Sequence, residues 1–535
     1  MALGIDFGTT RTIVAYVDRG NYPVVSFFDS GEDPHDHFPS VVADHDGTLV
    51  YGFEALDAAR NGAPVARSFK RLLASPEVNA DSPVRIGERE VPLMEVLTGF
   101  ASALKVALSA SSSIAADLAP GNGNGSSNGD GNYSGGRPPS VWSATIAVPA
   151  HAHGAQRYLT LEAFRGAGFD VTGMVNEPSA AGFEYTHGQR RTLNSKRTRV
   201  IVYDLGGGTF DASLVNADGT DHEVLDSLGL NRLGGDDFDV ALATCALRQV
   251  RRTPDSLGAA AYAQLLDDCR DAKEHLSPQS KRIPLEVEGT PVIVTVAEFY
   301  DAVSHLVNAT IEAMSPLVGG LDHEALAESE IAGIYLVGGA SGLPLVPRLV
   351  RSKFGRRVFR SPYPAASTAI GLAIAADETA GYSLTDNLSR GFGVFREAEG
   401  GRVLAFDALV DRTLTLDRER DVVVTRRYRA AHNVGWFRFV EYSALDEAGG
   451  PRGDIVPFAH VVFPFDPSLQ GEGAEAESTA ASTPVVRREH GPEIEERYEI
   501  DPNGIVSVRL TDLDTGFTRT YALRGGTAGA GAATR

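Results

Sequence analysis

Hydrophobic and polar positions follow two different patterns along the chain. Up to about residue 378, short β-branched segments alternate with longer Ala-, Leu- and Val-rich segments, and this alternation predicts an α/β domain. From about residue 391 onward, short strand-like segments are separated by turn residues, which is typical of an all-β sandwich. The expected strands of this part cover residues 422–428, 436–442, 458–465, 498–500, 505–510 and 518–523. The Asp-Pro-Asn-Gly turn at residues 501–504, flanked by alternating apolar residues, predicts a hairpin.

Three segments have a composition that does not suit a packed core. Residues 109–140 are rich in Gly, Asn and Ser, residues 471–484 in Glu, Ala, Ser and Thr, and residues 525–535 in Gly and Ala. Such segments bury too little apolar surface to offset the entropy lost on ordering. We therefore expect a flexible insertion, a flexible loop and a disordered tail, respectively. The predicted parts of the chain are an α/β domain 1–378, a linker 379–390, a smaller β domain 391–524 and the tail 525–535.

Length and charge narrow the class of protein. The 535 residues exceed the ~250–300 at which a single core stops growing, so more than one domain is expected. A formal net charge of −21 argues against nucleic acid as a partner, because binding phosphates needs a basic face. The sequence suggests no apolar run that approaches the ~18 residues of a membrane span, and we expect no export signal at its start. We expect a cytoplasmic protein that contacts neither membrane nor nucleic acid.

Two glycine-containing turns repeat the same plan. Residues 3–10 run from an apolar strand through Asp6 into Gly8, Thr9 and Thr10, and a second strand follows. Residues 200–211 repeat strand, aspartate, glycine-rich turn, threonine and strand. Backbone N–H groups in such turns can approach a phosphate closely, and the aspartates can hold a hydrated cation. The repeat suggests two related lobes that face one polyphosphate.

A third glycine turn, at residues 337–342, follows an apolar strand and opens a helix. This placement suits an adenosine pocket, although a simple strand-to-helix turn also uses glycine. The sequence contains no GxxxxGK[ST] motif and no strand-linked GxGxxG, so P-loop and Rossmann sites are excluded.

Small residues mark two further segments. Residues 176–181 (Asn-Glu-Pro-Ser-Ala-Ala) and 369–373 (Ala-Ile-Gly-Leu-Ala) predict helices that can cross closely, at a joint between lobes.

Lys70 is the candidate cation for a γ-phosphate, although a solvated helix lysine would be the ordinary interpretation without the surrounding motifs.

Taken in order, these motifs resemble the heat-shock protein 70 (DnaK-like) chaperone family. The resemblance rests on the first phosphate turn, on Lys-Arg-Leu at residues 70–72 and on Ala-Val-Pro-Ala at 147–150. It rests also on the segments 176–181 and 204–211, on Leu-Gly-Gly-Asp-Asp-Phe-Asp at 233–239 and on the later glycines. Residues 498–508 resemble the family's client-binding β domain.

The resemblance implies an actin-like ATPase fold of two duplicated lobes, followed by a β-sandwich. It implies a protein-folding chaperone of the stress response that hydrolyses ATP by in-line attack of water. ATP or ADP and Mg²⁺ are the expected cofactors, with K⁺ as a further candidate. Unfolded or extended polypeptides are the expected partners, and a monomer is the expected state.

Residue roles carried over from the family are as follows. Water-mediated Mg²⁺ binding falls on Asp6, Glu177 and Asp204. The catalytic group comprises Lys70, Glu177, Asp204, Thr209 and Asp211. Nucleotide binding falls on Gly8, Thr9, Thr10, Gly206, Gly207, Gly208, Thr209, Gly235, Lys273, Ser277, Gly338, Gly339 and Ser341.

Several positions depart from the family pattern. Residues on the adenosine side of the family's site are replaced here by Gly342, Arg270 and Glu274. Ala365 stands where the interlobe helix usually has an aspartate, and Gly173 stands where many members have an arginine that meets J-domain cochaperones. The leucine-rich acidic linker is replaced by residues 382–388, and the sequence after Leu523 does not predict a helical lid. The resemblance is therefore to a lidless variant, with action of a J-domain protein or of a nucleotide exchange factor left open.

Three functions remain open at this point. The acidic set and Lys70 favour a chaperone-like ATPase whose nucleotide state controls polypeptide release. The altered linker and adenosine positions favour an ATP-sensing scaffold that hydrolyses slowly or not at all and docks one dedicated partner. A sugar or acetate kinase is the least favoured, because a C-terminal β domain has no role in that chemistry.

Overall fold

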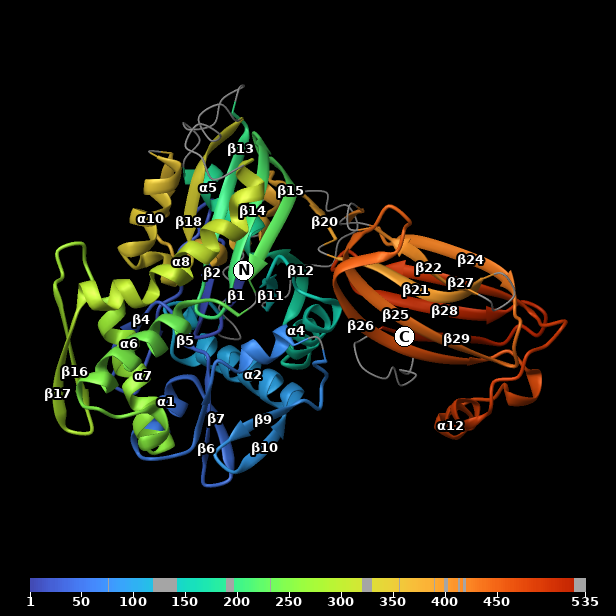
Figure 1. Cartoon of the computed structure of the whole chain (residues 1–535), viewed down its shortest axis with the longest axis horizontal. Helices are drawn as coiled ribbons and strands as arrows, with labels where there is room; N and C mark the ends of the chain where they lie inside the picture. The colour runs from blue at the N-terminus through green and yellow to red at the C-terminus, as the bar shows by residue number, and fades with distance from the viewer. Residues whose placement is uncertain are drawn as a thin grey trace. The chain divides into compact units, whose positions relative to one another are not determined.

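The computed structural model describes the chain as two compact units (Figure 1). The first contains Met1–Arg71, Pro83–His151 and Ala163–Leu384, and the second contains Leu72–Ser82, Ala152–Glu162 and Thr385–Arg535. The division at Leu384 falls inside the segment 379–390 that the sequence predicts as a linker. The described residues are 1–75, 77–118, 142–188, 197–230, 232–319, 330–355, 357–388, 390–398, 403–411, 414–416 and 420–523.

A five-stranded sheet carries the first glycine turn of the first unit. Its strand order is β12 (Asp170–Asn176), β11 (Ser143–Val148), β1 (Ala2–Phe7), β2 (Arg11–Tyr16) and β5 (Phe38–Pro39). Strands β1 and β11 are parallel, whereas β1 and β2 form an antiparallel hairpin around the turn. Every residue of β11 is buried, as expected for an inner strand covered on both faces.

A second sheet in the same unit carries the other two turns. Its strand order begins with β19 (Val358–Arg360), β18 (Ile331–Val337), β13 (Arg199–Leu205), β14 (Phe210–Asp218) and β15 (Asp221–Leu230). Strands β13 and β14 form an antiparallel hairpin, and β13 and β18 are parallel. The predicted repeat of strand, aspartate, glycine turn and strand is therefore confirmed at the level of these two hairpins.

Two helices cross closely in the first unit. They are α5 (Glu177–Gly188) and α11 (Ser367–Ala376). A Cβ atom at Gly371 would lie 1.7 Å from the Ala180 carbonyl oxygen, so only glycine fits at this crossing. Gly4 meets α11 in the same way, because its Cβ would lie 2.3 Å from the Ala373 nitrogen. The predicted close crossing of small-residue helices is confirmed.

Helix α2 (Leu93–Ala110) corrects one expectation from the sequence. It is the one helix in the described residues that is long and apolar enough to cross a membrane by length and composition. Two charged residues interrupt it, so the chain shows no unbroken apolar run. Within the first unit the Phe100 ring lies 5.3 Å from the ring of Phe7 and 5.6 Å from the ring of Phe69. These contacts are typical of a core helix.

The remaining larger elements of the first unit cover the two sheets or extend from them. They are α1 (Gly52–Arg60), β6 (Val41–His45), β7 (Thr48–Tyr51), β9 (Pro83–Ile86), β10 (Arg89–Pro92), α6 (Gly235–Gln249), α7 (Ala259–Glu274), β16 (Arg282–Val287), β17 (Thr290–Thr295), α8 (Val296–Val318) and α10 (Leu345–Phe354). Helix α4 (Gly154–Gly166) has residues in both units.

The second unit contains two four-stranded antiparallel sheets. One has the order β22 (Val403–Val410), β21 (Gly391–Ala398), β25 (Val434–Leu445) and β26 (Pro451–Pro464). The other has the order β24 (Val422–Arg429), β27 (Glu493–Ile500), β28 (Val506–Asp512) and β29 (Thr518–Ala522). Buried side chains from both sheets, including Phe439 and Tyr498, belong to one core.

The predicted hairpin at residues 501–504 is confirmed. Strands β27 and β28 pair antiparallel on either side of it. The Asp501 carboxylate accepts hydrogen bonds from the backbone N–H groups of Asn503 and Ile505, and Gly504 has a φ of 76°. Asparagine, aspartate and glycine therefore form this turn by the mechanism that the sequence suggested.

Two expectations for low-complexity segments were wrong in part. Residues 471–484 were expected to be a loop, but α12 (Ala474–Ser482) lies there and buries Ala480 (Figure 1). Alanine and glutamate have high helix propensity, and this outweighs the serines and threonines. The insertion at 109–140 was expected to begin at residue 109, but α2 runs to Ala110 and α3 (Ala115–Leu118) follows. Residues 119–140 and the tail 525–535 lie outside the described residues.

Candidate functional site

The first two glycine turns face each other across a cavity in the first unit. A Cβ at Gly207 would lie 3.1 Å from the Thr10 side chain, and one at Gly208 would lie 3.0 Å from Thr9 Oγ1. Each turn is closed by its own backbone, since Gly8 donates to Asp6 O and Gly206 donates to Thr209 O. Two turns rich in glycine and threonine therefore present backbone N–H groups toward one space.

Carboxylates gather behind these turns. Asp6 lies near the end of β1, Glu177 begins α5, and Asp204 and Asp211 are directly paired across the β13–β14 hairpin. Directly opposed residues in an antiparallel pair project to the same face of the sheet. Glu177, Asp204 and Asp211 are buried, and Asp211 Oδ1 has no hydrogen-bond partner within the described part of the chain.

The pKa values of these acids reflect their confinement. Burial, followed by repulsion from Glu177, raises the pKa of Asp6 to about 7 and that of Asp211 to about 8. The pKa of Asp204 is raised well above its ordinary value, first by burial and then by Glu177 and Asp6. A group of buried acids that resists ionisation is a site that gains stability when a cation enters.

Lys70 is the one basic residue among these acids in the described structure. It lies on the 3₁₀ helix η1 (Phe69–Ala74), and its Nζ donates to Glu177 Oε1 over 2.9 Å. Its Nζ also lies 5.3 Å from the centroid of the Phe7 ring. Burial alone would lower the pKa of Lys70, but the carboxylates of Glu177 and Asp6 raise it above the ordinary value. Lys70 is therefore a fixed positive charge.

These residues fit a nucleotide with a divalent cation. The site contains four carboxylates and only one positive charge, that of Lys70. When the carboxylates ionise, the site can therefore accept further positive charge. Asp6, Glu177 and Asp204 are the residues that would hold hydrated Mg²⁺. In the described residues, no group of three or more His, Cys, Asp or Glu side chains is arranged to hold a metal ion directly. A cation that keeps its water shell and contacts phosphate fits this donor set.

The third turn is built around Gly338. Its φ of 82° favours glycine, and a Cβ there would lie 2.4 Å from Asp204 Oδ1. The 3₁₀ turn η3 (Gly339–Gly342) follows, and Ser341 Oγ donates to the Gly338 carbonyl over 2.7 Å. A Cβ at Gly339 would meet no atom within 4 Å, so its backbone borders open space. The backbone of the turn therefore packs closely against Asp204 at Gly338 and borders open space at Gly339.

Ion pairs surround the side of the cavity expected to hold adenosine. Lys273 Nζ donates to the Gly235 carbonyl over 2.8 Å and pairs with Asp239. Arg270 pairs with Asp239 and Asp236, at 3.2 and 3.3 Å. The residues on this wall therefore neutralise one another in this conformation.

Further polar contacts join Arg11 and the segment 67–68 to α6 and α7. Arg11 pairs with Glu274, and Arg67 pairs with Asp267. Ser68 Oγ donates to Asp236 Oδ2 over 2.8 Å. The innermost cavity, which includes Lys70 and Glu177, has a volume of about 110 Å³. This is smaller than the ~300 Å³ at the lower end for small-molecule sites, so these contacts must separate to admit a nucleotide.

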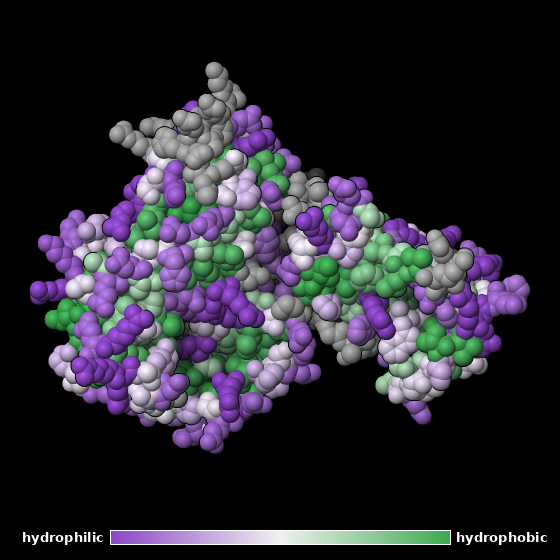
Figure 2. Space-filling view, in the orientation of Figure 1, coloured by the Kyte–Doolittle hydropathy of each residue, from purple (hydrophilic) through white to green (hydrophobic). Residues whose placement is uncertain are grey.

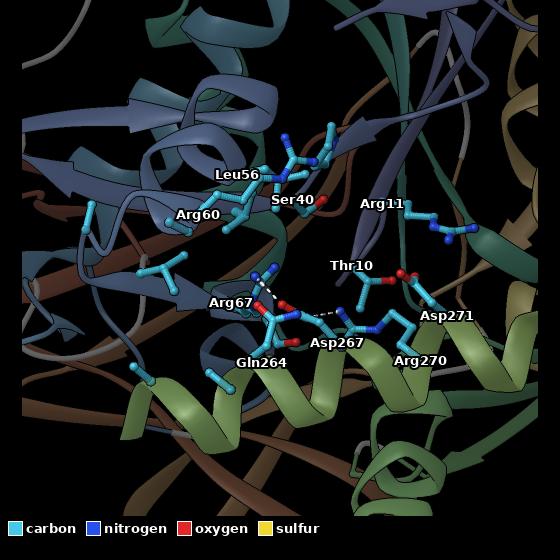
Figure 3. A pocket seen from close by; sticks show the side chains of 18 of the residues that line it. Thr10, Arg11, Ser40, Leu56, Arg60, Arg67, Gln264, Asp267, Arg270 and Asp271 are labelled. Carbon is cyan, nitrogen blue, oxygen red and sulfur yellow. Dashed lines mark hydrogen bonds and ion pairs between the residues drawn. The ribbon is translucent and has the colours of Figure 1, made fainter. Parts of the chain in front are cut away.

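A second cavity adjoins the first and holds about 320 Å³. The two share Thr10, Arg11 and Arg270 among their lining residues. Figure 3 shows Arg67 paired with Asp267 beside this second cavity, and Arg270 of α7 also pairs with Asp267. Both cavities lie within the first unit.

The structure brings together most of the residues proposed from the sequence. Those that line the innermost cavity are Asp6, Gly8, Thr9, Thr10, Lys70, Glu177, Asp204, Gly206, Gly207, Thr209, Gly235, Lys273, Gly338 and Gly339. Gly208 packs on Thr9, and Asp211 is buried beside the cavity. Ser277 is exposed after the end of α7, and Ser341 is fully buried, so neither lines the cavity in this conformation.

Arg11 and Asp239 are among the lining residues that sequence reasoning missed. Arg11 directly follows Thr10 of the first turn, and this position could have identified it as a lining residue. Asp239 ends the Leu-Gly-Gly-Asp-Asp-Phe-Asp segment, and its spacing within α6 places it over the turn that carries Gly235. Both residues form ion pairs with α7, which no local pattern indicates.

A family comparison agrees with this geometry. The family model described as Hsp70 protein matches residues 135–389. The match covers just under half of the chain and supports membership of the Hsp70 family. The matched span contains Glu177, the second turn and Gly338, whereas Asp6, Lys70 and the second unit's sheets lie outside it or at its edge. Hsp70 proteins are ATPases with an actin-like fold that bind ATP or ADP with Mg²⁺ and act on unfolded polypeptides, so membership supports an ATP-binding, chaperone role.

Proposed function

We propose that the chain is an ATP-hydrolysing chaperone of the Hsp70 family, in which ATP hydrolysis controls the binding of extended polypeptide. The observation that carries this proposal is the contact between Lys70 and Glu177 inside a group of buried acids, framed by two facing glycine turns. In this proposal residues 1–378 form an actin-like ATPase domain of two lobes, and residues 391–524 form a β-sandwich for clients.

The residues of the chain have distinct parts in the proposed reaction. Backbone N–H groups of the turns at residues 8–10 and 206–209 bind the phosphates. Lys70 stabilises negative charge on the transferred phosphoryl group and orients water, as a preorganised cation in a water-poor site does. The unpaired Asp211 Oδ1 is a buried acceptor that can orient the attacking water. Asp6, Glu177 and Asp204 would hold hydrated Mg²⁺, which would supply positive charge against the phosphates.

A second candidate function rests on the adenosine side of the cavity. Arg270 is engaged by Asp236 and Asp239, and Glu274 is engaged by Arg11. A nucleotide must compete with these ion pairs, which favours an ATP-sensing scaffold with slow or absent hydrolysis. In that case the second unit would dock one dedicated partner.

Steady-state phosphate release separates these two functions. The full chain is incubated with Mg²⁺ and ATP, with and without an unfolded peptide, and phosphate release is measured. The chaperone proposal expects turnover that the peptide alters, and turnover that is abolished by chelating Mg²⁺. Tight ATP binding without phosphate release in either condition would instead identify the scaffold. A screen of phosphate acceptors excludes a kinase if ATP loses its phosphate to water alone.

A further inference from the structure

The second unit contains a groove lined by strands of both of its sheets. It has a volume of about 860 Å³ and is lined by residues of β21, β22, β24 and β25. Strands β22 and β24 each stand at the end of their sheet's strand order. The edge of such a strand presents unpaired backbone N–H and C=O groups, which suit an extended segment of another chain.

Large apolar side chains are exposed in this groove. Leu404 is 68% exposed, Val485 is 50% exposed and Trp436 is 44% exposed, although all three line the same cavity. Single exposed apolar residues are ordinary, but several in one groove mark a binding surface. On the face shown in Figure 2, the second unit carries hydrophobic side chains at its surface between hydrophilic ones. The groove can therefore hold apolar side chains of a partner.

Five arginines and only two carboxylates line the groove. The arginines are Arg396, Arg426, Arg427, Arg429 and Arg438, and the acids are Glu397 and Asp407. This excess of positive charge occurs in a chain of formal net charge −21. The remaining charge of the groove depends on which arginines already have partners.

Three of these arginines are held by neighbouring carboxylates. Arg396 donates to Glu496 and Asp407, with 2.8 Å from its Nε to Asp407 Oδ2. Arg426 also pairs with Asp407, and Arg427 pairs with Glu495. The neighbouring carboxylates largely compensate the charges of these three arginines. They therefore line the groove but are less available to bind a charged ligand.

The other two arginines are available to a ligand. Arg438 is exposed and forms no hydrogen bond or ion pair with any of the described residues. The Arg429 side chain is 68% exposed; it donates to the Gly491 carbonyl over 3.4 Å and forms long ion pairs of 3.9 Å with Glu493 and Asp514. Trp436 and Arg438 are two positions apart on β25 and are both exposed, so they project from the same face of the strand. A cation and an apolar platform therefore lie side by side.

We propose that this groove binds an extended, acidic polypeptide segment. Its apolar side chains pack on Trp436 and Leu404, and its Asp or Glu carboxylates pair with Arg429 and Arg438. Guanidinium groups bind carboxylates in a planar, two-bonded geometry, which favours these acids over a neutral amide. The inference rests on the proposed polypeptide-binding function and adds the chemical class of the client.

Three labelled peptides of matched sequence test the proposal. They share one apolar core and differ only in flanking residues, which are Asp and Glu, Asn and Gln, or Lys. Their affinity for the full-length chain is measured by fluorescence anisotropy at low and high salt. The acidic peptide should bind about tenfold tighter than the neutral one, and the basic peptide should bind weakest. Raising the salt should reduce the difference, because exposed charges are screened.

Charge reversal locates the contact. Arg438→Glu and Arg429→Glu should each weaken the acidic peptide by about fivefold to tenfold and leave the neutral peptide nearly unchanged. The matched control is Arg509→Glu, which reverses an exposed arginine on β28 outside the groove. Circular dichroism and thermal melting confirm that each variant is folded.

The possible outcomes separate this inference from the function on which it rests. Equal binding of the three peptides, or tightest binding of the basic one, overturns the inference and leaves polypeptide binding intact. Unchanged affinity in both groove variants also overturns it. Failure of all three peptides to bind overturns both the inference and the polypeptide-binding function.

Discussion

Lys70 Nζ donates to Glu177 Oε1 over 2.9 Å, although 107 positions separate the two residues in the chain. Lys70 lies on a short 3₁₀ helix and Glu177 on the first turn of α5, so two distant elements fix one charged pair. The pair is buried, and the same lysine is also attracted by Asp6. This arrangement places a permanent cation where the proposed reaction develops negative charge.

Replacing Lys70 by alanine should lower the ATPase rate far more than ATP affinity. Loss of one preorganised electrostatic group typically costs ~10²–10³ in kcat, because its effect is concentrated in the transition state. Phosphate release and the Kd for ATP are measured separately. The control is Lys353→Ala, which removes an exposed lysine of α10. Unchanged turnover in Lys70→Ala would remove this residue from the proposed mechanism.

Replacing Asp204 by asparagine should abolish the dependence of nucleotide binding on Mg²⁺. The carboxylate is buried and its pKa is raised well above the ordinary value, first by burial and then by Glu177 and Asp6, which marks a position that benefits from a cation. Calorimetric titration of ADP with Mg²⁺ and with EDTA gives the test. We expect EDTA to weaken binding by the native chain by tenfold or so and to have little effect on the variant.

An exposed aspartate of α8 offers the matched control for this change. Asp301→Asn removes the same charge at the surface and should keep the native response to EDTA. If Asp204→Asn kept that response as well, Asp204 would not contribute to the cation site.

Two adjacent glycines give a further test of the third turn. At Gly338, φ is 82° and a Cβ would lie 2.4 Å from Asp204 Oδ1, whereas at Gly339 a Cβ would meet nothing within 4 Å. Gly338→Ala should therefore lower the free energy of unfolding by ~1–3 kcal/mol and displace Asp204. Gly339→Ala should leave stability nearly unchanged. Thermal melts of both variants measure the difference, and equal stability would contradict the assigned conformation.

The turns could be predicted from the sequence because their physics is local. Glycine and threonine next to an aspartate at a strand end allow few other structures, and the hairpins of β1 and β13 have the expected form. The close crossing at Gly371 was indicated by small residues in both helices. These features depend on side-chain size and on the conformational freedom of the backbone, both of which follow directly from residue type.

Long-range ion pairs could not be predicted in the same way. Arg11 and Glu274 are 263 positions apart, and their pairing depends on how the first sheet's turn meets α7. Helix α12 was mistaken for a loop because its serines and threonines suggested one. At Glu441, register shifts in β25 accompany four successive buried residues, which the expected alternation of strand positions does not allow.

Glu441 leads to a prediction about pH. Within the second unit it is buried, it accepts a hydrogen bond from the Gly154 backbone over 2.8 Å, and Arg390 lies 3.7 Å away. Burial raises its pKa from 4.5 to about 7 despite the nearby arginine. The unfolded chain loses this proton near pH 4.5, so the folded state holds more protons between these values. Stability from this group is therefore lost as pH rises from about 4.5 to about 7.

Glu441→Gln should remove the loss of stability that ionisation of Glu441 causes as pH rises. Glutamine can still accept from Gly154 but cannot ionise, so the variant should match the native chain near pH 4.5. At pH 8 it should be more stable by up to about 3 kcal/mol, the free energy that corresponds to the pKa shift. Denaturant unfolding of both chains across this range measures the difference. Glu447→Gln, at an exposed position in the β25–β26 connection, should show no such trend. A stability difference that stayed constant with pH would mean that Glu441 is ionised throughout in the folded chain.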